Sequence, residues 1–162
     1  MFNPVCIMGM GYVGLTLSVV LAENGYDVWG IEIDKEVVKK LNKGEPHFFE
    51  QNLAVRLKYQ LKENKLHVVT KAPDITFNVI IISVGTPLKK GTKVPNLSYI
   101  KQVIEDVALL IQPGCLVCVR STVSVGITRS KILPILEEKS GLKAGNDFYL
   151  AFTPERTIEG KA

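Results

Sequence analysis

The sequence contains few of the residues that build metal sites and disulfide frameworks: three cysteines and two histidines in 162 residues. His47 and His67 are isolated, so we expect neither a disulfide scaffold nor a metal site. Cys115 and Cys118 form a C-x-x-C pair, which could be a redox pair or half a zinc site. They fall in an apolar run typical of a buried strand, where positions three apart face opposite sides of the sheet. Core packing is therefore the expected role of all three thiols, Cys6 included.

Long apolar runs and strong net charge are also missing. No run approaches the roughly 20 residues that span a bilayer, and the N-terminus lacks the pattern of a signal peptide. We therefore expect a cytoplasmic protein without a membrane partner. The net charge of +4 is too mild and too dispersed to indicate a nucleic-acid partner. A composition of 46% hydrophobic and 22% charged residues predicts one globular domain over residues 1–162.

A glycine-rich stretch near the N-terminus is the most informative feature present. The apolar run Val5–Met8 leads into G-x-G-x-x-G, formed by Gly9, Gly11 and Gly14, and a helical pattern follows. In a dinucleotide site the first glycine makes the tight turn, the second lets the backbone approach the pyrophosphate, and the third packs the helix on the strand. The motif alone is weak evidence, because glycine turns also occur without ligands.

An acidic residue in the right place strengthens the dinucleotide hypothesis. A second apolar run, Val28–Ile31, ends in Glu32, which follows Gly14 by about the 20 residues expected of a ribose-binding acid. The alternative is a solvated glutamate at a strand end. A carboxylate here would repel a 2′-phosphate, so the sequence favours NAD over NADP.

Strand and helix patterns alternate along the whole chain. Strands are predicted at 4–8, 28–31, 66–70, 78–84, 115–119 and 148–152, and helices at 14–24, 35–42, 52–64, 97–111 and 126–140. Asn96 is the expected N-cap of the fourth helix, and Pro134 should kink or offset the fifth. This alternation predicts an α/β fold of the Rossmann type, a doubly wound six-stranded parallel sheet in the order 3-2-1-4-5-6.

Ligands of such a sheet lie beyond the carboxyl ends of the strands. Small hydroxyl residues and an acid follow the last three predicted strands there, in the segments 83–87, 120–123 and 153–156. These strand ends and the glycine motif together resemble the N-terminal NAD-binding domain of the UDP-glucose/GDP-mannose dehydrogenase family. Residues 9–15 are similar to its G-x-G-Y-V-G-L, 30–34 to its G-V-D-I-D, 83–87 to its V-G-T-P loop, and 121–128 to its S-T-V-P-P-G-T-T.

Some positions depart from the family pattern. Glu32 replaces the ribose-binding aspartate, which adds one methylene group. The family often has E-P-G-L after the second helix, whereas Glu50-Gln51-Asn52-Leu53 keeps only the ends, which puts the local turn in question.

The resemblance implies roles for particular residues. Thr122 would hold a catalytic water or a substrate hydroxyl near the nicotinamide, and Glu155 would serve in general acid–base chemistry and contact the substrate. Arg156 would bind the substrate; a structural salt bridge is its alternative. Likewise Thr122 could be a helix cap and Glu155 a surface acid. The implied contacts to NAD come from Gly9, Gly11, Tyr12, Val13, Gly14, Glu32, Val84, Gly85, Thr86 and Thr122.

The resemblance also implies that a longer enzyme carries the full activity. The family oxidises C6 of a UDP-sugar to the uronate with two NAD, through a thioester on a cysteine of a G-x-C-x-x-K-D motif that this sequence lacks. We expect a substrate domain beyond Ala162, dimerisation only of the full-length enzyme, and no activity of this chain alone. The segment Pro154-Glu155-Arg156 with Gly160-Lys161-Ala162 resembles the UDP-N-acetylhexosamine branch, including UDP-N-acetylmannosamine enzymes. The alternatives are a stand-alone nucleotide-binding module and the cofactor domain of another dehydrogenase family.

Overall fold

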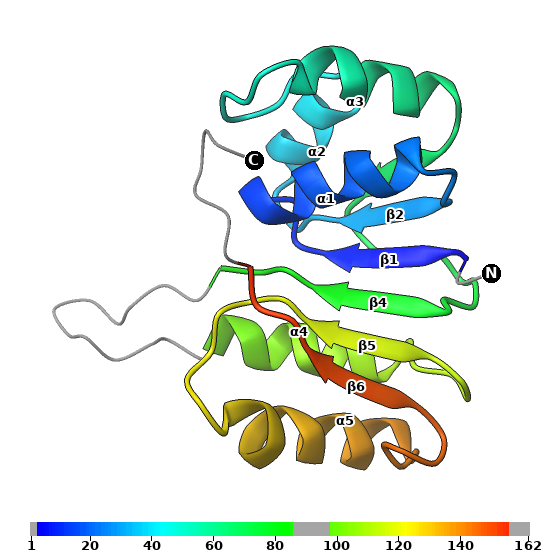
Figure 1. Ribbon diagram of the computed structural model, residues 1–162, viewed down its shortest axis with the longest axis vertical. Helices are drawn as coiled ribbons and strands as arrows, with labels where there is room; N and C mark the ends of the chain where they lie inside the picture. Colours follow the sequence, from blue (N-terminus) through cyan, green and yellow to red (C-terminus); the bar gives the residue numbers. More distant parts are fainter. Residues whose placement is uncertain (1–2, 86–97, 156–162) are drawn as a thin grey trace, which may run out of the picture.

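A computed structural model describes residues 3–85 and 98–155. Within them one parallel sheet has the order β3-β2-β1-β4-β5-β6, as the sequence predicts. All carboxyl ends lie at the same edge, on the left in Figure 1. The strands are β1 Val5–Met8, β2 Val28–Ile31, β3 Leu66–Val69, β4 Val79–Ile82, β5 Leu116–Val119 and β6 Tyr149–Phe152. The helices are α1 Tyr12–Glu23, α2 Lys35–Leu41, α3 Leu53–Lys62, α4 Ser98–Ala108 and α5 Leu133–Ser140.

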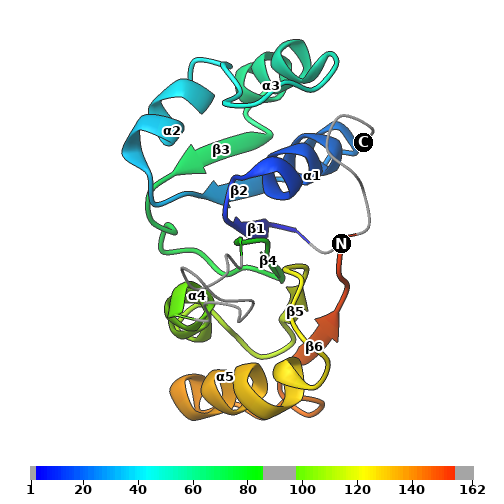
Figure 2. The same ribbon diagram turned by 90° about the vertical axis from the view of Figure 1, so that its left-hand side faces the viewer.

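The two faces of the sheet bury separate hydrophobic clusters because side chains alternate along each strand. Cys6 and Ile80 belong to the cluster under α4 and α5, whereas Ile7 and Ile81 belong to the cluster under α1 and α3. Figure 2 shows α1 and α3 on one side of the sheet and α4 and α5 on the other. Both faces of the central strands are thus covered, which explains the unbroken apolar run of β4.

The fifth predicted helix begins differently from the expectation. Residues Thr128–Ile132 form a π-helical turn, and α5 follows directly. Pro134 has no N–H to give to the carbonyl four residues earlier, so an α-helix cannot run unaltered through this point. The expected offset is therefore present as a π-helical turn. The predicted N-cap Asn96 and the first predicted residue of the fourth helix, Leu97, lie outside the described residues.

The thiols pack as predicted. Cys6 and Cys115 lie in the cluster under α4 and α5, and Cys118 packs against the opposite cluster. Burial raises the pKa of Cys6 to about 12 and that of Cys115 to about 11. Burial also raises the pKa of the Cys118 thiol. All three cysteines are free, and none is poised as a thiolate.

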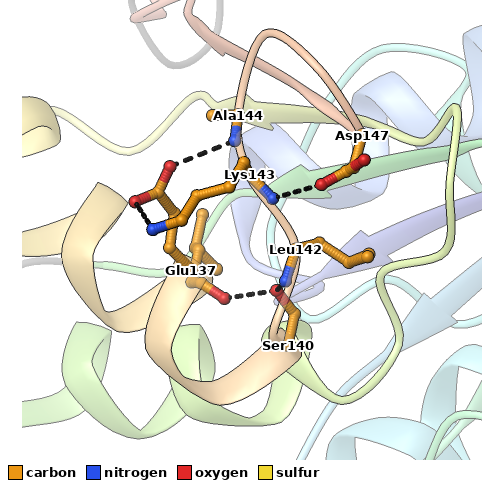
Figure 3. Close-up of polar contacts among 7 residues, drawn as sticks. Glu137, Ser140, Leu142, Lys143, Ala144 and Asp147 are labelled. Carbon is orange, nitrogen blue, oxygen red and sulfur yellow. Dashed lines mark hydrogen bonds and ion pairs between the residues drawn. The ribbon is translucent and has the colours of Figure 1, made fainter.

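A polar network fixes the turn that leads into β6 (Figure 3). Glu137 near the end of α5 accepts hydrogen bonds from Lys143 Nζ and the Ala144 N–H, both at 3.1 Å. These donors, the lysine first, hold the pKa of the Glu137 carboxyl below its ordinary value. The Lys143 N–H donates to Asp147 at 2.7 Å, and the Leu142 N–H donates to the Ser140 hydroxyl at 3.1 Å. The network therefore fixes the turn before β6, and Glu155 follows the other end of this strand.

Candidate functional site

The glycine turn joins β1 to α1 with no space for side chains at two of its glycines. Gly9 has a φ of +95°, a left-handed conformation that favours glycine. A Cβ at Gly14 would stand 1.9 Å from the Gly9 carbonyl oxygen. This geometry fits the tight turn and the close helix packing that the sequence predicts at these two glycines.

The Met10 side chain packs the glycine turn against β2. Its side chain is fully buried, and a Cβ at Gly30 of β2 would stand 2.3 Å from the Met10 sulfur. The absence of a side chain at Gly30 thus creates the space that Met10 fills. Sequence reasoning missed this pair, although a glycine inside an apolar strand is a recognised mark of close approach.

The N-terminus of α1 lies at the glycine turn. Gly11 is its N-cap and has no side chain with which to cap the helix, and the first turn has no acidic residue. By contrast, Asp34 caps α2 by accepting hydrogen bonds from the N–H groups of Glu36 and Val37. A Cβ at Gly11 would meet nothing within 4 Å. The helix N-terminus and the space at Gly11 suit a diphosphate.

Glu32 lies beside this turn. Its Oε2 accepts a hydrogen bond from the Met10 N–H and its Oε1 one from the Asp34 N–H, both at 3.1 Å. The two bonds fix the carboxylate between the turn and the start of α2. A carboxylate can accept about four hydrogen bonds, so these two leave capacity for ribose hydroxyls. The placement of Glu32 is consistent with the ribose contact that the sequence predicts.

The ends of β4 and β5 meet next to the glycine turn. A Cβ at Gly9 would stand 2.9 Å from both the Ser83 carbonyl oxygen and Val84 Cγ1. The buried Ser121 donates from its hydroxyl to the Val84 carbonyl at 2.7 Å. This bond brings Thr122, which is exposed, and Gly85 to the same edge of the sheet.

Glu155 follows β6 and forms an ion pair with Arg120, which follows β5. Both side chains are mostly buried, with 18% of Glu155 and 27% of Arg120 exposed. Arg120 Nε is buried without a hydrogen-bond partner among the described residues. Arg120 is not among the residues singled out from the sequence, although a cation directly after an apolar strand could have indicated a partner. The other predicted residues of this edge, Thr86 and Arg156, lie outside the described part of the chain.

The described residues also form a groove that is separate from the predicted site residues. An open, mainly apolar groove of about 730 Å³ runs between β6 and residues 124–133, with Val125 and Tyr149 in its wall. It contains none of the predicted site residues. The described residues hold no group of three or more His, Cys, Asp or Glu side chains that could bind a metal. None of the helices in the described ranges has the length and apolarity to cross a bilayer.

Comparison with known proteins supports the assignment of the chain as an NAD-binding domain. Residues 3–162 match the model of the UDP-glucose/GDP-mannose dehydrogenase family, NAD binding domain. The chain is 40% identical over 158 residues to a UDP-N-acetyl-D-mannosamine dehydrogenase of Pyrococcus horikoshii, covering 97% of this chain and 37% of that protein. It is 33% identical to a GDP-mannose 6-dehydrogenase of Pseudomonas savastanoi pv. phaseolicola, with 98% and 37% covered.

Solved structures give the same result. The P. horikoshii UDP-D-ManNAc dehydrogenase superposes with a TM-score of 0.90 at 41% identity, covering 96% of this chain and 37% of that one. A ternary complex of GDP-mannose dehydrogenase from Pseudomonas aeruginosa superposes with a TM-score of 0.87 at 30% identity, again with 96% and 37% covered. This chain therefore spans a little over a third of the length of the relatives it matches.

Proposed function

Because this chain belongs to the UDP-glucose/GDP-mannose dehydrogenase family and matches its NAD-binding domain, we propose that it holds NAD for the oxidation of a UDP-linked N-acetylhexosamine. The observation that carries the cofactor half is the N-terminus of α1, whose N-cap Gly11 has no side chain, with the Glu32 carboxylate beside it. The family match decides against the cofactor domain of an unrelated dehydrogenase family.

The residues at the sheet edge fit NAD. The N–H groups of the first turn of α1, at Tyr12 and Val13, would bind the diphosphate, and Glu32 would accept from the ribose hydroxyls. Val84 and Gly85 would line the nicotinamide half. NAD supplies a hydride acceptor at its nicotinamide ring. The acid at position 32 would disfavour a 2′-phosphate, so NADP should bind less tightly.

Thr122 and Glu155 are proposed to act on the substrate. When a hydride leaves C6 of the sugar, the proton of its hydroxyl must move to a base, and the Glu155 carboxylate is proposed to receive it directly or through a water held by Thr122. Arg120 supports this role by holding the Glu155 side chain at this edge through the ion pair. Arg156 would contact the charged part of the substrate.

The chain on its own is proposed to bind NAD without completing the reaction. Oxidation to the uronate consumes two NAD in this family and needs a cysteine nucleophile. Cys6 and Cys115 cannot serve, because both are buried with strongly raised pKa values. The thioester cysteine, a substrate-completing domain and any dimer contacts would belong to a longer protein.

The substrate is proposed from relatives and from one motif. The P. horikoshii relative at 40% identity is a UDP-N-acetyl-D-mannosamine dehydrogenase. The segment Pro154-Glu155-Arg156 resembles the same branch. UDP-N-acetylmannosamine is therefore the proposed substrate, ahead of UDP-glucose and GDP-mannose.

Calorimetry and a turnover assay test these proposals separately. The folded chain should bind NAD+ and bind NADP+ at least about tenfold more weakly, as expected for an unpaired 2′-phosphate next to a carboxylate. With NAD+ and UDP-N-acetylmannosamine it should produce no NADH absorbance at 340 nm. A folded chain that does not bind NAD+ would overturn the cofactor proposal, and turnover by this chain would overturn its incompleteness.

The substrate proposal needs the intact gene product that contains this domain. Reading the gene beyond Ala162 should show a G-x-C-x-x-K-D motif, and the corresponding protein should reduce NAD+ faster with UDP-N-acetylmannosamine than with UDP-glucose or GDP-mannose. Equal or faster reduction with another sugar nucleotide would contradict this choice. A stop codon directly after Ala162 would favour the stand-alone nucleotide-binding module instead.

A further inference from the structure

The connection from β2 to β3 contains two helices, and the segment between them returns to the first turn of α1. The Tyr12 hydroxyl donates a hydrogen bond to Glu50 Oε2 at 2.7 Å. The rings of Tyr12 and Phe48 lie with centroids 4.9 Å apart and planes at 56°. The ring of His47 in turn lies edge-on to Phe48, with centroids 5.0 Å apart. Residues 47–50 therefore form a wall beside the proposed diphosphate site.

This wall has a fixed backbone. Asn52, directly before α3, has a φ of +62°, the left-handed conformation that asparagine tolerates better than most residues. The family pattern E-P-G-L has glycine at this position. The local turn that the sequence comparison put in question therefore still has a residue in the left-handed conformation. Leu53 and Leu57 of α3 are buried in the same cluster as α1. The backbone that carries Glu50 is thus held by core packing.

The same connection also holds the far end of α1. Arg56 donates two hydrogen bonds to Glu23, at 2.7 and 2.6 Å, from Nε and one terminal nitrogen. Tyr12 and Glu23 are the first and last residues of α1. Residues 50–56 therefore bind both ends of the helix whose N-terminus faces the cofactor.

We propose that Glu50 is a positioning residue of the dinucleotide site, which acts on the cofactor through Tyr12. This inference rests on the proposed NAD binding. Tyr12 is the first residue of a helix whose N-cap is a glycine without a capping side chain, and helix ends fray unless contacts hold them. The Glu50 carboxylate and the Phe48 ring hold Tyr12 by its side chain. The N–H groups of the first turn are then already oriented before a diphosphate arrives, which lowers the entropy cost of binding.

The charge of Glu50 acts in the opposite direction, and the two effects can be separated. A carboxylate near a diphosphate site repels the ligand, whereas its role as acceptor for Tyr12 favours binding. Glu50→Gln keeps an acceptor oxygen and removes the charge. Glu50→Ala removes both. Positioning therefore predicts that glutamine preserves binding and alanine weakens it.

The test is calorimetric titration of this chain with NAD+, ADP and adenosine. Glu50→Ala and Tyr12→Phe should each weaken NAD+ and ADP binding by about 10- to 100-fold, the usual effect of one lost hydrogen bond to a charged group. The double variant should be no weaker than the weaker single variant. Glu50→Gln should stay within about threefold of the wild type. Glu45→Ala, at an exposed glutamate earlier in the same segment, is the matched control and should bind like the wild type.

Adenosine separates positioning from a general loss of stability. It lacks phosphates, so its affinity should be the same in all variants if Glu50 acts on the first turn of α1. Equal weakening of adenosine and ADP would overturn the inference, and so would wild-type NAD+ affinity of both Glu50→Ala and Tyr12→Phe. Tighter binding of both Glu50 variants would show that charge repulsion dominates, which also overturns it. If the wild type binds no NAD+, the proposed function itself fails.

Discussion

Replacing Gly14 and Gly11 by alanine should separate folding from cofactor binding at the same turn. At Gly14 the new methyl group would stand 1.9 Å from the Gly9 carbonyl oxygen, whereas an ordinary contact needs at least 3.4 Å. The helix and the turn must therefore move apart by about 1.5 Å, the difference between these distances. Both sides of the contact are backbone. Overpacking costs about 1–3 kcal/mol, and we expect the upper end of this range for Gly14→Ala.

The matched variant is Gly11→Ala. Its methyl group meets nothing within 4 Å, and the φ of −67° is open to alanine. The expected cost is below about 1 kcal/mol, from the weaker N-cap preference of alanine. The methyl group would, however, occupy the space through which a diphosphate approaches the N–H groups. We expect NAD+ binding to weaken about 10- to 100-fold through lost charge-assisted hydrogen bonds.

Urea unfolding and calorimetry check both variants. A loss of about 3 kcal/mol lowers the thermal midpoint of a chain of this size by roughly 6–12 °C and the urea midpoint by about 1.5 M. Wild-type stability of Gly14→Ala would refute the packing argument. Wild-type NAD+ affinity of Gly11→Ala, with the fold intact, would refute the assignment of the diphosphate to this turn.

Three further outcomes are expected. Glu32→Ser should lower the ratio of the NADP+ dissociation constant to the NAD+ dissociation constant by about tenfold or more in calorimetry. An unchanged ratio would contradict the proposed repulsion between the Glu32 carboxylate and the 2′-phosphate. Because the folded pKa values of Cys6 and Cys115 exceed the ordinary 9.0, the native state keeps protons that the unfolded state loses. The free energy of unfolding, from urea titrations, should therefore fall as the pH rises from about 9, and Cys6→Ala should reduce this slope. A double-mutant cycle of Arg120→Met and Glu155→Gln should give a coupling of about 1 kcal/mol in urea unfolding, since the pair is partly exposed; strict additivity would contradict it.

Local patterns were enough to predict the sheet and its order. Apolar runs of four to seven residues, separated by helical repeats, specify parallel strands, and the glycine turn identifies the first of them. The strand predicted at 28–31 is observed with these bounds, whereas the other five were predicted one or two residues too long at one end or both, as for 78–84, observed as Val79–Ile82. The terminal residues of a strand differ from the adjacent loop only in whether a neighbouring strand pairs with them. That pairing is not encoded locally.

The parallel α/β sheet, the dinucleotide turn and the position of its acid could be predicted because each depends on residues close together in the chain. The side chains that support these residues became visible only in the folded chain. Met10 fills the space at Gly30, Glu50 accepts a hydrogen bond from Tyr12, and Arg120 forms an ion pair with Glu155. Each of these pairs joins residues at least 20 positions apart that meet only when the strands align. Their contacts therefore follow from the assembled sheet and cannot be derived from a local pattern.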